Sequence, residues 1–176
     1  MNKSYFAKVI LCVVIILALI GIYSAADKPA SIGGQKQEIV KIGVSLPLTG
    51  KSASIGERVK NAIQLAHEDI NKNISTNSSS ANNAAPQYKL ELIIEDDQGE
   101  STPTVSVIQK LIQTDKTKII LGLIKSDPLL AIAPITEKEK VIVMSPTAGA
   151  DGISTAGDYI FRTIETAIMH GKKGAS

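Results

Sequence analysis

The sequence predicts an α/β fold: a three-layer arrangement in which a parallel sheet carries helices on both faces. Short runs of β-branched and aliphatic residues alternate three times with longer segments of helical period, the pattern of successive βαβ units. Polar, Gly or Pro residues close each short run. The 176 residues are 44% apolar with a net charge of +2, enough apolar surface for one folded domain and a targeting segment.

The N-terminus has the pattern of an export signal. Lys3 and Lys8 precede an uncharged apolar stretch over 9–23, and small residues follow at 24–26. We therefore expect residues 1–26 to be a signal peptide or, if they stay attached, a membrane anchor, because the apolar run is about long enough to span a bilayer. Either outcome places the rest of the chain outside the cytoplasm, in the periplasm or its equivalent.

A linker and a first strand come next. Residues 27–38 are rich in small and polar residues without apolar period, which indicates a linker. The β-branched run from Ile39 ends at Pro47 and predicts a strand buried on both faces.

The first helix is expected to begin at a capping box formed by Ser54 and Glu57 and to end near Asn71. Helical spacing predicts one buried stripe on it, made of Val59, Ala62, Ile63, Ala66 and Ile70. The polar, low-complexity residues 71–87 are expected to be a long loop.

Two more helices and four more extended segments complete the pattern. One helix is expected to start at the cap Thr102 with Pro103 behind it, and the other at the cap Asp127, ending near Lys140 and kinked at Pro134. The expected strands are 90–95, 118–124, 141–144 and a weaker one at 159–163.

Charge and cysteine content exclude two classes of protein. Without Lys3 and Lys8 the 19 basic residues become 17, equal to the 17 acidic ones, and no long basic run exists, so we expect no nucleic-acid binding. Cys12 is the only cysteine and lies inside the apolar run. The exported part therefore has neither a disulfide nor a cysteine-based zinc site.

The residues needed for catalysis are sparse. Neither His67 nor His170 is on a strand-end loop, and Ser145 lacks the G-x-S-x-G of a nucleophile elbow. No phosphate-binding glycine series occurs. The acidic run 95–97 leaves two interpretations open: a cation or phosphoryl site, or a solvated loop in which Asp97 helps to cap the next helix. We expect no enzyme activity, no cofactor and no metal site.

Two of the expected strand-end loops suit a small anion. Ser126 precedes the third helix, and Thr147, Ala148 and Gly149 form a small-residue bend after the fourth strand. Because parallel strands end at one edge of a sheet, hydroxyls and backbone N–H groups from both loops can meet on one carboxylate there.

These segments together resemble the branched-chain amino-acid binding proteins of ABC importers, which have the type I periplasmic binding fold with Rossmann-like lobes. IGVSLPLTGKSASIGERVKNAIQLAHEDIN (42–71) and LELIIEDDQGESTPTVSVIQKLI (90–112) look like the first two units of that family, and IILGLIKSDPLLAIAPITEKEKVIVMSPTAGA (119–150) looks like the next two. The resemblance implies that residues 39–163 are the N-terminal lobe. Residues 164–176 would begin the crossover to a second, missing lobe.

The resemblance also implies a ligand site. In the family, a Ser after the third strand and an S-P-x-A-[ST] bend after the fourth hold the carboxylate and amino groups of an amino acid. The matching positions are Ser126, Thr147, Ala148 and Gly149. Gly149 departs from the usual hydroxyl residue, and the charged Lys125 and Asp127 stand where the family has small residues.

The function implied is the extracytoplasmic solute-binding component of an ABC transporter, present as an incomplete first lobe. Its ligand would be a small amino acid or amide-like molecule, and its partner a membrane permease. Two alternatives stay open: a ligand-sensing extracellular domain of a membrane receptor, and a non-functional truncated remnant.

Overall fold

The computed structural model describes residues 37–80 and 88–174, which fall within one compact unit beginning at Gln37. The expected signal segment 1–26 and nearly all of the expected linker lie outside the described residues. Within the described ranges, no helix combines the length and the apolar character needed to cross a membrane.

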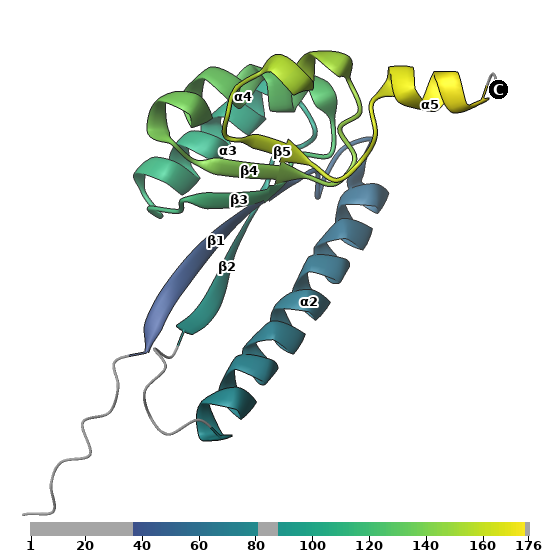
Figure 1. The fold of residues 1–176 in the computed structure, drawn as a ribbon. Helices are drawn as coiled ribbons and strands as arrows, with labels where there is room; N and C mark the ends of the chain where they lie inside the picture. Colours follow the sequence, from purple (N-terminus) through teal and green to yellow (C-terminus); the bar gives the residue numbers. More distant parts are fainter. Residues whose placement is uncertain (1–36, 81–87, 175–176) are drawn as a thin grey trace, which may run out of the picture. The chain divides into compact units, whose positions relative to one another are not determined.

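A five-stranded sheet forms the centre of the fold, and all its strand pairs are parallel (Figure 1). The strand order is β2-β1-β3-β4-β5, so the chain starts near one edge, steps outward once and then crosses to the other edge. The strands are β1 (Glu38–Leu46), β2 (Tyr88–Asp96), β3 (Ile119–Gly122), β4 (Ile142–Ser145) and β5 (Ile160–Arg162). The predicted parallel α/β fold is confirmed.

Helices lie on both faces of this sheet, as Figure 1 shows, although one face is covered only in part. One face packs against α3 and α4 and encloses the main core, which includes Ile108, Leu111, Ile120, Ile132 and Val143. The other face carries α2 over β1 and β2, with a smaller core around Val44 and Leu46. The helices are α2 (Ala53–Ser80), α3 (Ser101–Gln113), α4 (Ser126–Glu139), α5 (Ala167–Gly174) and a 3₁₀ turn η1 (Asp151–Thr155).

The predicted start and end of α2 are both wrong. The helix begins at Ala53, where Ser52 O accepts the N–H groups of Ile55 and Gly56, so Ser54 lies inside the first turn and does not open a capping box. The helix also continues past Asn71 to Ser80, which replaces most of the predicted loop; residues 81–87 lie outside the described part.

Asn71 explains why the helix does not end there. Its Oδ1 accepts the N–H of Leu90 at 2.9 Å, and its Nδ2 donates to Leu90 O at 3.1 Å. The side chain therefore completes the backbone hydrogen bonds of the outer strand β2 and does not compete for the backbone of its own helix. His67 lies one turn earlier, with Nε2 2.9 Å from the same carbonyl oxygen.

The N-caps of α3 and α4 each lie two residues before the predicted ones. Glu100 is the N-cap of α3, so Thr102 lies inside its first turn, and Lys125 is the N-cap of α4, ahead of Asp127. Both N-cap residues have extended backbone and make no side-chain cap bond. Lys140 ends α4 in the left-handed conformation, close to the predicted end.

β1 is not buried on both faces along its whole length. Its last half is buried, but Ile39 is 56% exposed. Only residues from Ile42 onward pair with β3, so the first half of β1 has β2 as its one neighbour and projects beyond the helices of the main core.

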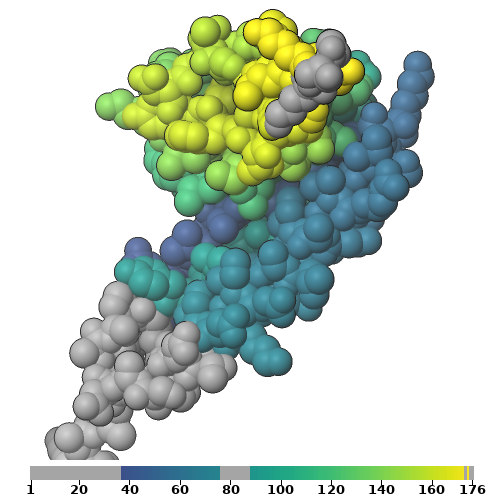
Figure 2. All heavy atoms as spheres, turned by 45° about the vertical axis from the view of Figure 1, so that its right-hand side comes forward, coloured from purple at the N-terminus to yellow at the C-terminus, as the bar shows by residue number. Residues whose placement is uncertain are grey.

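The apolar stripe of α2 is also less buried than predicted. Val59 and Ile63 are half-buried, while Ile70 is 45% exposed, and α2 lies along one side of the described part with its side chains at the surface (Figure 2). Beside the helix, a hollow of about 450 Å³ lies over the sheet. Its lining from α2 includes Ile55, Val59 and Ala66, and its lining from the sheet and strand ends includes Leu121, Met144 and Pro146. Parallel sheets are normally covered on both faces, and the face over β3–β5 is uncovered within the described residues.

Candidate ligand site at the carboxyl edge of the sheet

The candidate ligand loops are residues 123–126, between β3 and the start of α4, and residues 146–150, after β4. The first loop begins with an abrupt turn at the end of β3. Gly122 has φ +110° and Leu123 has φ +55°, so two successive residues leave the extended conformation. A Cβ on Gly122 would lie 2.1 Å from Ser45 O, which makes glycine necessary at this close approach to β1. The turn leads the chain to Ser126, the first residue of α4.

The structure brings Ser126 and the bend after β4 together, as the sequence predicted. Ala150 N donates to Ser126 Oγ at 3.2 Å, and Thr147 Oγ1 donates to Ile124 O at 2.9 Å. Two hydrogen bonds therefore join loops that lie more than 20 residues apart in the chain.

The hydrogen bonds decide which groups remain available to a ligand. Thr147 uses its hydroxyl hydrogen on Ile124 O, and Ala148 is buried with its N–H donated to Ser145 Oγ. Among the donors of these loops that have no acceptor within the described residues are the hydroxyl hydrogen of Ser126 and the N–H groups of Thr147 and Gly149. The N–H groups of Ser126 and Asp127, in the first turn of α4, have none either. The unpaired donors of Ser126, Thr147 and Gly149 suit a carboxylate. The N–H of Ala148 is already bonded, so Ala148 shapes the bend.

Lys125 has a structural contact that its sequence position did not reveal. Its Nζ donates to Gly99 O at 2.7 Å and lies 3.4 Å from Glu100 Oε1. These contacts tie the loop after β2 to the start of α4. They border a polar hollow of about 410 Å³, which Ser126 and Asp127 also line.

The acidic run 95–97 serves the fold of these loops. Asp96 Oδ1 accepts the N–H groups of Leu48 and Gln98, and its Oδ2 accepts the Thr49 hydroxyl at 2.5 Å. No group of three or more His, Cys, Asp or Glu side chains that could hold a metal ion occurs among the described residues. The predicted solvated loop in which Asp97 caps the next helix is wrong, because Asp97 is buried and α3 has Glu100 as its N-cap with no side-chain cap bond. The contacts of Asp96 and Asp97 instead hold the loop itself together.

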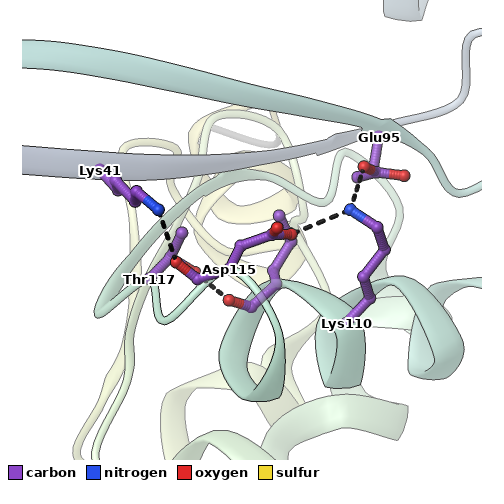
Figure 3. Close-up of polar contacts among 6 residues, drawn as sticks. Lys41, Glu95, Lys110, Asp115 and Thr117 are labelled. Carbon is purple, nitrogen blue, oxygen red and sulfur yellow. Dashed lines mark hydrogen bonds and ion pairs between the residues drawn. The ribbon is translucent and has the colours of Figure 1, made fainter.

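Glu95 points toward Lys110 of α3 (Figure 3). Lys110 Nζ lies 2.7 Å from Glu95 Oε1 and 2.9 Å from Asp115 Oδ2, and Lys41 Nζ lies 3.5 Å from Asp115 O. The cluster connects α3 and the turn after it to β1 and β2. These contacts raise the pKa of Lys110, with the hydrogen bond to Glu95 as the largest cause.

Asp97 is the most buried acid of the run, with 2% of its surface exposed. Its Oδ2 accepts the Ser45 hydroxyl at 2.8 Å and its Oδ1 accepts Gly99 N at 2.8 Å. Burial raises the pKa of Asp97 above its ordinary 3.8, although both hydrogen bonds act in the opposite direction. Burial also acts to raise the pKa of the neighbouring Asp96, but its hydrogen bonds, led by the one from Thr49, outweigh burial and lower it.

These opposite shifts predict opposite pH dependences. Because the folded state holds the Asp97 proton more tightly, that group stabilises the fold as pH falls from its folded pKa toward 3.8. Asp97→Asn removes this component, so the urea midpoint of the variant should rise relative to that of the parent chain as the pH is raised from 3.8 through the folded pKa of Asp97. Asp96→Asn is the opposite control: its midpoint should fall below that of the parent above pH 3.8 and approach it below the lowered pKa. A difference for Asp97→Asn that stays constant with pH would contradict the assignment.

Fold and site together define a class: a parallel α/β lobe with unpaired hydrogen-bond donors on the loops beyond its strand ends. The sequence profile of the periplasmic binding protein family matches residues 39–176. The chain belongs to this family, and the resemblance found in the sequence is confirmed.

Among its relatives is the leucine-, isoleucine-, valine-, threonine- and alanine-binding protein of Pseudomonas aeruginosa, 30% identical over 135 residues that make up 76% of this chain and 34% of that protein. A Leu/Ile/Val-binding protein of Rhizobium johnstonii is 29% identical, over 67% of this chain and 29% of that protein. The chain thus spans about a third of the length of these relatives.

Solved structures agree. A leucine-binding protein of Thermotoga maritima matches with a TM-score of 0.65 and 28% identity, over 77% of this chain and 35% of that one. A solute-binding protein of an ABC transporter from Rhodopseudomonas palustris, in complex with 3,4-dihydroxybenzoic acid, matches with a TM-score of 0.61 and 30% identity, over 73% of this chain and 32% of that one.

Proposed function

We propose that the chain is the first lobe of an extracytoplasmic solute-binding component of an ABC importer, and that it holds the carboxylate of a small ligand at Ser126, Thr147 and Gly149. The observation that carries the proposal is that these three residues have unpaired hydrogen-bond donors. The donors lie on two loops that are joined to each other by hydrogen bonds. Ala148 contributes through its place in the bend. The residues are assigned to binding, and no catalytic step is proposed.

The unpaired donors suit a carboxylate, and the ligands named for two similar proteins each carry one. These ligands are the amino acids named for the Pseudomonas relative and the aromatic acid in the Rhodopseudomonas complex. The start of α4 adds the positive end of a helix dipole beside Ser126. The carboxylate of Asp127 in that first turn repels an anion, while the ammonium group of Lys125 attracts one.

One lobe supplies one wall of the site. In the proposed protein, a second lobe closes over the ligand and the closed form delivers it to a membrane permease, with residues 1–26 directing export and 27–38 acting as the linker. On a single wall most of the ligand stays hydrated, so we expect dissociation constants on the order of 1 mM for this chain.

The proposal is tested by equilibrium titration of the full chain with L-leucine and, separately, 3,4-dihydroxybenzoate. Ser126→Ala removes the one free hydroxyl donor and should weaken binding of whichever acid binds by about tenfold, since a hydrogen bond to a charged group contributes about 1.5 kcal/mol or more. The matched control is Ser106→Ala, the same change at an exposed serine of α3, which should leave binding unchanged. Binding of neither acid, or equal binding by both variants, would contradict the proposal.

A further inference from the structure

Two fully buried serines lie at the carboxyl edge of the sheet, Ser45 in β1 and Ser145 in β4. Both have 0% of their surface exposed. Ser45 Oγ donates to Asp97 Oδ2 at 2.8 Å. Ser145 Oγ donates to Leu123 O at 2.8 Å and accepts the N–H of Ala148 at 3.2 Å. The second hydroxyl therefore contacts both loops of the proposed ligand site.

Leu123 is the residue between these two strands, and its backbone is held from both sides. Its N–H donates to Ser45 O at 2.8 Å, while its carbonyl accepts the Ser145 hydroxyl. Leu123 has φ +55° and is 1% exposed. A branched apolar residue rarely adopts this conformation, so the surrounding contacts must stabilise it.

The bend after β4 needs a side-chain acceptor for the N–H of Ala148. Ala148 is 1% exposed, and a buried N–H without a partner is costly. The Ser145 hydroxyl accepts this N–H at 3.2 Å. The residues before and after Ala148, Thr147 and Gly149, have N–H groups without an acceptor among the described residues.

We propose that Ser145 is a positioning residue of the ligand site: its one hydroxyl fixes the turn at Leu123 that leads to Ser126 and the bend that presents Gly149. The inference rests on the proposed function, because it concerns the same site. Ser145 itself does not reach a ligand, since it is fully buried and its hydroxyl hydrogen is donated to Leu123 O. For the same reason it is not an exposed nucleophile.

The chain offers a matched control at the opposite end of β3. Thr117 precedes that strand, is 1% exposed, and its hydroxyl also donates to a backbone carbonyl, that of Leu111 at 3.0 Å. Thr117→Val and Ser145→Ala each remove one buried hydroxyl that donates to a main-chain oxygen. Both should lower the melting temperature, so a difference between them in the ligand loops measures positioning and not stability.

The test compares the full chain with Ser145→Ala, Ser145→Cys and Thr117→Val, by amide NMR without ligand and by titration with L-leucine. Ser145→Ala should move the amide resonances of both Ser126 and Gly149 and weaken L-leucine binding at least tenfold. Ser145→Cys keeps a weak donor of similar size and should show smaller changes, which also covers the case in which the alanine variant does not fold. Thr117→Val should change neither the loop resonances nor the affinity.

The two readouts separate this inference from the function on which it rests. If the parent chain does not bind L-leucine, that ligand is wrong, and the resonances of Ser126 and Gly149 still decide the role of Ser145. Unchanged resonances of either loop in Ser145→Ala and Ser145→Cys would overturn the inference. Equal loss of affinity in Ser145→Ala and Thr117→Val would overturn it as well.

Discussion

Gly122→Ala should strongly destabilise the protein. The added Cβ would lie 2.1 Å from Ser45 O, an atom of the neighbouring strand backbone that cannot rotate away. The residue also has φ +110°, which side chains strongly disfavour. Backbone strain of this kind costs about 1 to 3 kcal/mol by itself, and the steric clash adds to it, so we expect a loss of about 3 to 5 kcal/mol of unfolding free energy.

Urea unfolding followed by circular dichroism measures this loss. The control is Gly152→Ala in η1, where the nearest atoms to an added Cβ are Leu130 methyl groups at 4.0 Å and φ is not in the left-handed region. That change should be close to neutral. If Gly122→Ala unfolds at the same urea concentration as Gly152→Ala, the close contact between β3 and β1 is incorrectly described.

Leu111→Ala should also strongly destabilise the protein. Leu111 is fully buried on α3 and belongs to the main core between the helices and the sheet. Its methyl groups lie against Gly43 of β1, where an added Cβ would meet Leu111 Cδ1 at 3.0 Å, so no side chain from the strand can fill the space that the leucine leaves. We expect a loss of about 2 to 5 kcal/mol, the range for leucine-to-alanine changes in packed cores.

The same substitution on α2 is the control for that loss. Leu65 is 62% exposed, so Leu65→Ala removes the same atoms from a site that buries little of them, and it should cost well under half as much in the same urea experiment. Equal losses at the two positions would mean that the core does not lie between α3, α4 and the sheet.

Periodicity in the sequence was sufficient for the elements themselves. The β-branched runs at 39–46 and 90–95 are strands, and the helix predicted near Thr102 forms, with Ile108, Leu111 and Ile112 on its buried side. The end of α2 could not be predicted in this way, because Asn71 is bonded to Leu90, 19 residues later, and a local pattern contains no information about that contact. The burial of its stripe likewise depends on which strands lie beneath the helix.

The candidate site shows the same division. The adjacency of Ser126 to the bend at 147–149 follows from the rule that parallel strands end at one edge, and it was predicted. The donors that remain unpaired could not be predicted from the sequence. The Thr147 hydroxyl donates to Ile124 O on another loop, and the Ala148 N–H donates to the buried Ser145 hydroxyl. The strand at 141–144 was predicted, but the buried hydroxyl of Ser145 at its end was not.

The most direct measurement of carboxylate binding is the amide NMR spectrum of the full chain during titration with L-leucine, beside a second titration with L-leucinamide. The two molecules differ in the group that the free donors are proposed to hold. We expect L-leucine to shift the Thr147 and Gly149 amide resonances in a saturable way and L-leucinamide to shift them at least tenfold more weakly. Equal shifts with both, or shifts confined to other parts of the chain, would contradict the proposed site.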